Sequence, residues 1–218
     1  MTLRKRVAIL ISGRGSNMAA LIAAAVEPAY PAEIALVASN RPDAPGLERA
    51  RAAGIAIAIV DHIPFGKDRE GFERALQAEL EAHRIELVCL AGFMRLFTPW
   101  FVGRWPGRML NVHPALLPSF KGLDTHSHAI AAGVKIHGAS VHLVVPEMDC
   151  GPIVAQAALA VGNDDTPGKL AERVLALEHL IYPLALRLLA EGRLRVENGR
   201  CLIEGWVPGD TTLVVPQM

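Results

Sequence analysis

The segment Asn111-Val112-His113-Pro114 carries two polar side chains that could act together on one substrate. Residues two apart lie on the same face of a β-strand, so Asn111 and His113 would point the same way before Pro114 takes the chain out of the sheet. An amide N–H and an imidazolium both stabilise the oxyanion that forms when an amine attacks an acyl carbon. We therefore interpret this pair as a candidate site for acyl transfer to an amine.

Asp149 is the candidate carboxylate for the same site, because it lies in the glycine- and proline-bounded turn Met148-Asp149-Cys150-Gly151-Pro152. A carboxylate beside a histidine favours its protonated form and orients its ring. The spacing in the sequence does not show whether Asp149 approaches His113. The amine itself would be the nucleophile, so the chemistry requires no catalytic serine or cysteine.

Two alternatives remain open for these histidines. A histidine in an N-x-H segment can be a structural core residue, and His126, His128, His137 and His142 could supply metal ligands. However, the chain has neither an H-E-x-x-H motif nor cysteine-rich zinc spacing. We therefore predict no metal.

A glycine-rich loop, Ser12-Gly13-Arg14-Gly15-Ser16-Asn17, follows an apolar strand and precedes a helix. Free amides at a helix start attract anions such as phosphate, although a plain tight turn would explain the glycines too. A dinucleotide-binding fingerprint would need a glycine at position 18, where this chain has Met18. A P-loop would need Gly-Lys-Ser/Thr, which the loop lacks. The loop thus predicts a phosphomonoester site without a nucleotide cofactor.

The composition narrows the classes of partner. The 218 residues contain 22 Lys+Arg and 22 Asp+Glu, so no global field favours nucleic acid or an anionic membrane. The cysteines Cys89, Cys150 and Cys201 form no C-x-x-C pair and indicate buried or incidental thiols in a reducing compartment. The apolar run Val7–Ile11 is too short for a signal peptide, and we expect a cytoplasmic protein that binds small molecules.

Strands and helices must alternate to position these residues. Apolar runs predict strands over Val7–Ile11, Ile34–Ala38, Ile55–Val60, Leu87–Leu90 and Met109–Val112. Helical segments are expected over Asn17–Ala25, Gly46–Ala53, Asp68–His83 and around Pro99–Trp105. Such alternation predicts an α/β fold: a Rossmann-like, mostly parallel sheet with helices on both faces, whose ligands bind beyond the carboxyl ends of the strands.

The second half of the chain has a different pattern. Strands are predicted over Ala139–Val145 and Ile153–Ala160, followed by a long helix over Thr166–Ala190 that Pro183 should kink or split. Arg193–Val196 and Cys201–Ile203 are expected to form a terminal hairpin. We expect one domain over residues 1–218, with a phosphate-binding half at about 1–105 and a catalytic, folate-binding half at about 106–218. The strands that the second half adds to the sheet are expected to be antiparallel.

The ordered segments ISGRGSN, SNRPDAPGLERA, AGFMR, NVHPALLPSFKG, HGASVH, MDCGPI and EHLIYP resemble the folate-dependent formyltransferases. Their order and spacing, over nearly the whole chain, resemble in particular the group that formylates glycinamide ribonucleotide in de novo purine synthesis. This resemblance implies the formyltransferase fold, 10-formyltetrahydrofolate as co-substrate, no tightly bound cofactor, and a monomer or homodimer.

The resemblance also implies roles for individual residues. Asn111, His113 and Asp149 match the catalytic trio, with His113 as general acid. Gly15, Ser16 and Asn17 match the segment that binds the substrate phosphate, and Glu178 matches a carboxylate that contacts the ribose hydroxyls. Folate-binding positions are expected at Arg69, near the glutamyl tail, at the pterin-binding backbone of Met94, Arg95, Leu96 and Phe97, and at Asn111. Core packing is the simpler interpretation of Phe93, Leu96 and Phe97. For Arg69, the simpler interpretation is a position on a solvated helix face.

Three positions depart from the family pattern. Arg14 stands where Asn or Thr is frequent, and Leu175 stands where Gln or Lys is frequent near the phosphate. We hypothesise that Arg14 supplies the charge that Leu175 lacks. Cys150 replaces the more usual glycine after Asp149, which places a thiol beside the site.

Two rival enzymes and one binding protein remain as alternatives. Transfer of formyl to methionyl-tRNA would call for a further RNA-binding domain and a basic surface. A 10-formyltetrahydrofolate hydrolase would use water in place of the amine and usually carries an additional N-terminal domain. A phospho-metabolite-binding module would leave the Asn–His–Asp set without a purpose.

Overall fold

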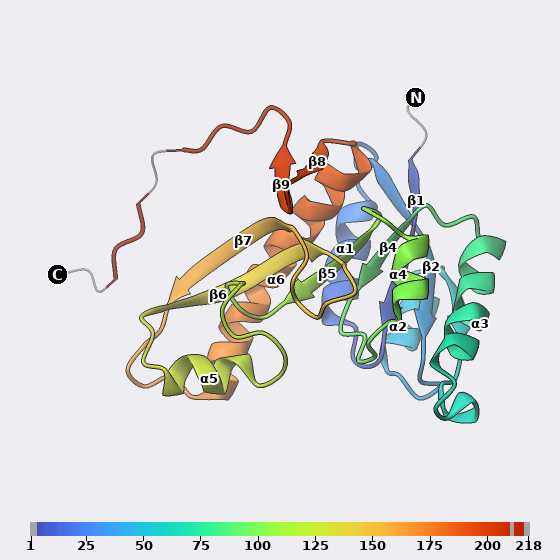
Figure 1. The fold of residues 1–218 in the computed structure, drawn as a ribbon, viewed down its shortest axis with the longest axis horizontal. Coiled ribbons are helices and arrows are strands. Elements are labelled where there is room, and N and C mark those ends of the chain that lie inside the picture. Colours follow the sequence, from blue (N-terminus) through green and yellow to red (C-terminus); the bar gives the residue numbers. More distant parts are fainter. Residues whose placement is uncertain (1–3, 210–211, 216–218) are drawn as a thin grey trace.

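The computed structural model of this chain describes residues 4–209 and 212–215. Seven strands form one sheet in the order β3-β2-β1-β4-β5-β6-β7, and β8 and β9 form a separate hairpin (Figure 1). The strands are β1 (Lys5–Ile11), β2 (Ala32–Ser39), β3 (Ala56–Ile59), β4 (Leu87–Leu90), β5 (Met109–His113), β6 (Ile136–Leu143), β7 (Ile153–Ala160), β8 (Leu194–Glu197) and β9 (Arg200–Ile203).

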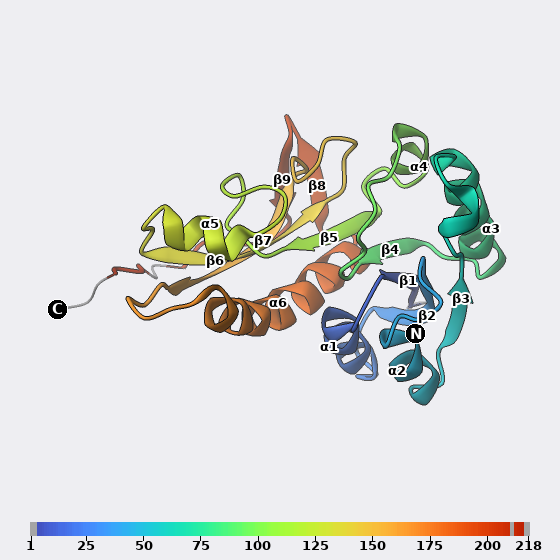
Figure 2. The same cartoon turned by 90° about the horizontal axis from the view of Figure 1, so that it is seen from below.

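The helices connect and cover these strands. They are α1 (Ser16–Ala25), α2 (Gly46–Ala52), α3 (Arg69–Ala82), α4 (Pro99–Arg104), α5 (Thr125–Ala131) and α6 (Pro167–Ala190), with a short 3-10 turn at Ile63–Phe65. Seen along the sheet, α1, α2 and α6 lie on one face and α3 and α4 on the other (Figure 2). No helix among the described residues is long and apolar enough to cross a membrane.

The sheet is parallel through β3, β2, β1, β4 and β5, and β6 and β7 add to it in antiparallel fashion. The predicted α/β class with a mostly parallel sheet and antiparallel additions is therefore confirmed. Strand β1 shows why residues 7–11 are all apolar: Val7, Ile9 and Ile11 face the core beneath α1 and α6, and Ala8 and Leu10 face the core beneath α3 and α4.

Most predicted elements are present, with ends shifted by one to three residues. The amphipathic stripe of Phe72, Leu76 and Leu80 is buried as expected, and the Thr166 hydroxyl caps α6 by accepting a hydrogen bond from the Lys169 amide. The sequence did not predict α5 or the 3-10 turn at Ile63–Phe65, both of which are short.

The expected split of the long helix at Pro183 is wrong. Helix α6 runs without interruption from Pro167 to Ala190 with Pro183 inside it. Tyr182, Ala185 and Leu186 are all fully buried, and the hydroxyl of Tyr30 donates a hydrogen bond to the Pro183 carbonyl at 2.7 Å. Burial of this face on the sheet opposes the cost of proline in a helix interior, about 3 kcal/mol.

Candidate active site

The strand order reverses at β1, because β2 and β3 lie on one side of it and β4 to β7 on the other. Ligands of open α/β sheets bind at such a switch point, beyond the carboxyl ends of the strands. Here the loops after β1 and β4 are joined: the Ser12 amide donates to the Gly92 carbonyl at 3.1 Å, and the Met94 amide donates to the Ser12 hydroxyl at 2.8 Å. The glycine-rich loop and the AGFMR segment therefore border the same edge.

Asn111 and His113 both lie on β5, the strand next to β4, and the structure brings Asp149 to them from the loop between β6 and β7. The Asp149 Oδ2 lies 3.5 Å from the His113 Nδ1, and the side chains are 10% and 6% exposed. Asp149 adopts a left-handed backbone conformation with φ of 51°. This turn aims the carboxylate back at the end of β5, so three residues separated in sequence form one cluster.

Both ring nitrogens of His113 face oxygen acceptors. The Nε2 donates to the Phe120 carbonyl at 2.9 Å, and the Nδ1 faces the Asp149 carboxylate. Only the imidazolium carries a hydrogen on both nitrogens, so this arrangement suits the protonated ring. A protonated His113 is the form that can donate to an oxyanion or to a leaving nitrogen.

Several donors hold Asp149 in its ionised form. Burial favours the protonated carboxyl, but the neighbouring His142 ring, the backbone amide of Gly122 and the charge of His113 outweigh burial and lower the pKa of Asp149 below its usual range. The Gly122 amide donates to Oδ2 at 2.9 Å. Asp149 is therefore anionic near neutral pH.

His142 is a site residue to which the sequence analysis gave no role beyond a possible metal ligand. It lies opposite Asn111 in the β5–β6 register and is 3% exposed. Its Nδ1 donates to the Leu143 carbonyl at 3.0 Å, which leaves Nε2 to accept from the Asn111 Nδ2 at 3.2 Å. His142 thereby orients the Asn111 amide. Only the pairing register could have revealed it.

Of the remaining three histidines of the sequence cluster, His126 and His137 pair with each other. The His137 Nε2 lies 3.3 Å from the His126 Nδ1, and burial lowers the pKa of His137 to about 4. A neutral pair of this kind packs beside Phe120. Among the described residues, no group of three or more His, Cys, Asp or Glu side chains could hold a metal ion.

The glycine-rich loop leads directly into α1. Gly15 has a φ of 69°, and the first hydrogen bond of the helix runs from the Ala19 amide to the Gly15 carbonyl at 3.0 Å. The amides of Ser16, Asn17 and Met18 precede that bond and form the positive end of the helix. Gly15 also packs closely, because a Cβ there would lie 3.3 Å from the Gly46 Cα.

Helix α6 meets this loop through Glu178, whose Oε2 accepts a hydrogen bond from the Asn17 Nδ2. Both side chains are buried, and the Asn17 Oδ1 has no hydrogen-bond partner among the described residues. Burial raises the pKa of Glu178, and the bond from Asn17 opposes that rise only in part. The structure therefore places Glu178 beside the predicted phosphate loop.

The predicted folate-binding segment, Met94 to Phe97, lies in the loop between β4 and α4. Met94 and Leu96 are 71% and 62% exposed, so the core interpretation of Leu96 is wrong. Phe97 is partly buried and stacks on Phe101 with centroids 4.2 Å apart. Arg69, at the first residue of α3, donates to the Leu96 carbonyl and so contacts the same segment.

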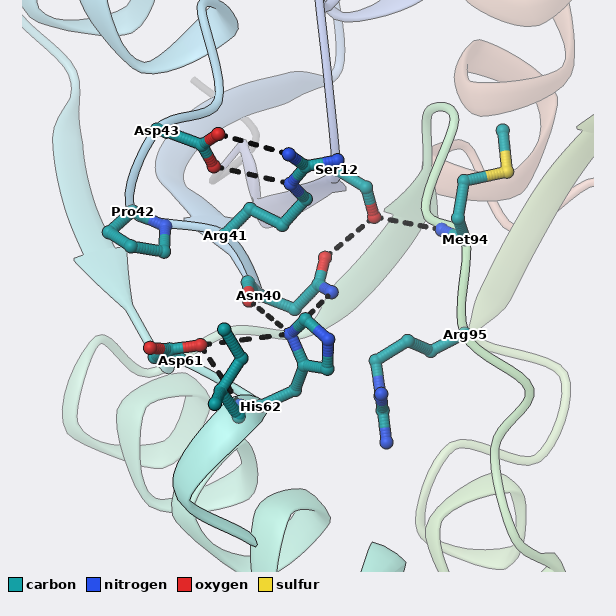
Figure 3. Close-up of a pocket in the computed structure, with 10 residues that line it drawn as sticks. Ser12, Asn40, Arg41, Pro42, Asp43, Asp61, His62, Met94 and Arg95 are labelled. Carbon is teal, nitrogen blue, oxygen red and sulfur yellow. Dashed lines mark hydrogen bonds and ion pairs between the residues drawn. The ribbon is translucent and has the colours of Figure 1, made fainter. Parts of the chain in front are cut away.

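A hollow of about 550 Å³ opens beside this segment at the carboxyl ends of β1 to β4 (Figure 3). The Ser12 hydroxyl donates to the Asn40 Oδ1 at 2.6 Å, and His62 donates from Nδ1 to the Asn40 carbonyl at 2.8 Å. The Arg95 guanidinium lies over the Phe72 ring. Asn40 and His62 were not singled out in the sequence, since each belongs to a different strand end.

An amide, a histidine and a carboxylate thus lie together at the end of β5, in the same parallel sheet whose β1 leads into the amides that begin α1. These features suit a transferase that passes an acyl group between two bound molecules. The chain belongs to the formyl transferase family, whose sequence model matches residues 5–186.

Relatives with known names support this membership. The chain is 42% identical to the phosphoribosylglycinamide formyltransferase of Escherichia coli (strain K12), over 91% of this chain and 93% of that protein. It is 46% identical to the human trifunctional purine biosynthetic protein adenosine-3, over 90% of this chain but 20% of that protein. The chain thus spans about a fifth of the trifunctional relatives.

Solved structures give the same result for the fold. The crystal structure of glycinamide ribonucleotide transformylase 1 from Symbiobacterium toebii superposes with a TM-score of 0.89 at 45% identity, covering 92% of this chain and 94% of that one. A formyltetrahydrofolate deformylase from Pseudomonas syringae superposes with a TM-score of 0.85 at 26% identity, and this chain covers 66% of it.

Proposed function

We propose that this protein transfers the formyl group of 10-formyltetrahydrofolate to the amine of glycinamide ribonucleotide, giving formylglycinamide ribonucleotide and tetrahydrofolate in de novo purine synthesis. The observation that carries the proposal is the Asn111–His113–Asp149 cluster, which lies at the end of β5 in the same sheet whose β1 leads into the positive end of α1. Relatives named for this reaction cover nearly all of both chains and support the same substrates.

The phosphate end of glycinamide ribonucleotide is proposed to bind the amides of Gly15, Ser16 and Asn17. Glu178, which is held by Asn17, would accept hydrogen bonds from the ribose hydroxyls. The Asn17–Glu178 hydrogen bond brings the two groups close together, which suits a ribose 5-phosphate.

Arg14 is proposed to add positive charge at this end. It is exposed, and it precedes Gly15 in the loop that leads into α1. Leu175 lies one turn before Glu178 on α6 and brings no charge to the loop. We expect Arg14→Ala to raise KM for glycinamide ribonucleotide about tenfold, the loss of one charge-assisted bond, with KM for the folate unchanged. An unchanged KM for the ribonucleotide would remove Arg14 from the site.

The folate is proposed to bind along Met94, Arg95, Leu96 and Phe97, with Arg69 near its glutamyl tail. The Met94 amide already bonds to Ser12 and the Leu96 carbonyl to Arg69, so the pterin would bind the amides of Arg95, Leu96 and Phe97. Arg69 contacts the Leu96 carbonyl, so it lies within reach of a ligand bound along that segment.

The chemical step follows from the cluster at the end of β5. The amine attacks the formyl carbon, and the oxyanion that forms is stabilised by the Asn111 amide and the His113 imidazolium. His113 then donates its proton as general acid to the folate nitrogen that leaves, and the proton that the attacking amine gives up returns to His113. Asp149 orients the His113 ring and stabilises its positive charge.

One assay tests the proposal against its rival. Purified protein is given 10-formyltetrahydrofolate with and without glycinamide ribonucleotide, and tetrahydrofolate release is followed spectroscopically. The expected result is release that depends on the ribonucleotide. Release without the amine would indicate the hydrolase, which the similarity to the deformylase keeps as a second candidate. A folded protein that releases none would overturn both.

We also propose that the enzyme acts in the cytoplasm as a monomer or homodimer, on free small molecules and with no tightly bound cofactor or metal. Sedimentation of the purified protein would decide its oligomeric state. Dialysis against a chelator, with full activity retained, is the result expected for a metal-free enzyme.

A further inference from the structure

The three thiols of this protein have different surroundings. Cys89 is fully buried in the sheet, and burial raises its pKa to about 12. Cys201 on β9 is half-buried, and burial raises its pKa as well. Cys150, by contrast, is exposed. The expectation of a buried thiol is therefore wrong for Cys150, and among the three it is the thiol that solution reagents can reach.

Cys150 lies in a hollow of about 390 Å³ that combines two thiols with two cations. The Lys121 ammonium donates to the Cys150 Sγ at 2.9 Å, and the thiol donates to the Met148 carbonyl at 3.2 Å. Arg200 and Cys201, at the start of β9, also line this hollow. An ammonium in contact with a sulfur stabilises the thiolate, which is the nucleophilic form of cysteine.

The same hollow is connected to the catalytic cluster through three consecutive residues. The Phe120 carbonyl accepts from His113, the Lys121 ammonium contacts Cys150, and the Gly122 amide donates to Asp149. Cys150 itself directly follows Asp149. The loop 120–122 is thus hydrogen-bonded to His113, to Asp149 and to the exposed thiol of Cys150.

We propose that Cys150 is a modification site at which a small anionic disulfide forms a mixed disulfide and stops formyl transfer. The Cys150 sulfur attacks one sulfur of the reagent, a new S–S bond forms, and the old S–S bond breaks. The other half of the reagent leaves as a thiol and takes the proton that Cys150 loses. Lys121 and Arg200 would bind the carboxylates of the reagent, which sets its chemical class.

An adduct on Cys150 has a defined way to act on the site. It must displace the Lys121 ammonium from the sulfur and occupy the hollow that Asp149 also lines. Movement of Lys121 would shift its neighbours Phe120 and Gly122, whose backbone groups are hydrogen-bonded to His113 and Asp149. Loss of the single bond from Gly122 to the carboxylate would lower the rate about tenfold or more.

The test uses oxidised glutathione as the anionic probe and 2-hydroxyethyl disulfide as a neutral one. We expect intact-mass measurements to show one adduct per chain, peptide mapping to place it on Cys150, and formyl transfer to fall about tenfold or more as the adduct accumulates. Dithiothreitol should restore the activity. The anionic probe should react several-fold faster than the neutral one, and Lys121→Met should remove that preference.

Two matched serine variants separate the thiols. Cys150→Ser should keep its activity in the presence of the probe, whereas Cys201→Ser should be modified and inactivated like the wild type. The proposal is overturned if Cys150→Ser is inactivated as fast as the wild type, or if Cys150 carries the adduct with activity unchanged. Mass spectrometry measures the adduct and its dependence on Lys121 without a formyl-transfer assay. This part of the proposal can therefore be tested even if the protein formylates an amine other than glycinamide ribonucleotide.

Discussion

His113 lies between the Phe120 carbonyl and the Asp149 carboxylate, and Asn111 beside it is oriented by His142. Each donor of the cluster therefore has a partner that fixes its direction before a substrate arrives. The Asn111 amide keeps a second N–H for the oxyanion, whereas the His113 Nε2–H must leave the Phe120 carbonyl to reach a substrate; donors oriented in advance are the basis of electrostatic catalysis. At the scale of single residues, Asp149 is the group whose removal tests this arrangement most directly.

Asp149→Asn should lower kcat about 100-fold or more, because an amide cannot hold His113 in the protonated form. Asparagine tolerates the left-handed conformation at this position, so the backbone of the loop should be retained. Steady-state kinetics with both substrates would measure the effect. A near-normal kcat would mean that Asp149 is structural.

The pH dependence of stability provides a control for the same variant. The folded state lowers the pKa of Asp149, so its carboxylate adds stability above the unfolded value of about 3.9 and loses it as the pH falls through the folded value. The difference in unfolding free energy between wild type and Asp149→Asn should be constant near neutral pH and shrink below about pH 4. Denaturant titrations at several pH values would measure it.

At the scale of elements, the pairing of β5 with β6 and the loop from β6 to β7 decide the site. Register places His142 opposite Asn111, and the loop returns along the end of β6, where the Leu143 amide donates to the Pro152 carbonyl at 2.9 Å. Gly151 permits this return, because a Cβ there would lie 1.7 Å from the Leu143 carbonyl oxygen. A side chain at Gly151 would therefore force the loop that carries Asp149 to shift.

Gly151→Ala should destabilise the protein by about 1–3 kcal/mol and also lower kcat. Gly138→Ala is the matched control, since a Cβ there would lie 1.9 Å from the Ala157 carbonyl oxygen, in the middle of the β6–β7 pair. We expect the control to lose comparable stability and to keep its kcat. Equal kcat losses in both variants would show that general destabilisation, not the position of Asp149, sets the rate.

At the scale of the whole molecule, the first helix and the long C-terminal helix meet at the glycine-rich loop. Asn17 on α1 and Glu178 on α6 are 161 residues apart in sequence and share a buried hydrogen bond. A buried carboxylate with a raised pKa is costly to ionise, and burial is the cause here. Ionised Glu178 therefore lowers the stability of the fold at neutral pH, although its proposed role is to bind the ribose.

Glu178→Gln should raise the free energy of unfolding at pH 7 and raise KM for glycinamide ribonucleotide about tenfold. A raised folded pKa gives stability at low pH that is lost as the pH rises through that value, so the gain should vanish below about pH 4, where Glu178 is protonated in both states. Thermal and chemical unfolding would measure the gain. A variant less stable than wild type at pH 7 would contradict this account.

The sequence by itself determined the strand–helix alternation, the carboxyl-end loops and the Asn111–His113 pair. Those features are local, since periodicity, glycine turns and i, i+2 spacing depend on nearby residues. The tertiary structure alone decided that Asp149 approaches His113, that His142 orients Asn111, that Asn17 bonds Glu178 and that Lys121 contacts Cys150. Each of these contacts joins segments far apart in sequence, and strand register and loop return, which set them, are decided by packing across the whole sheet.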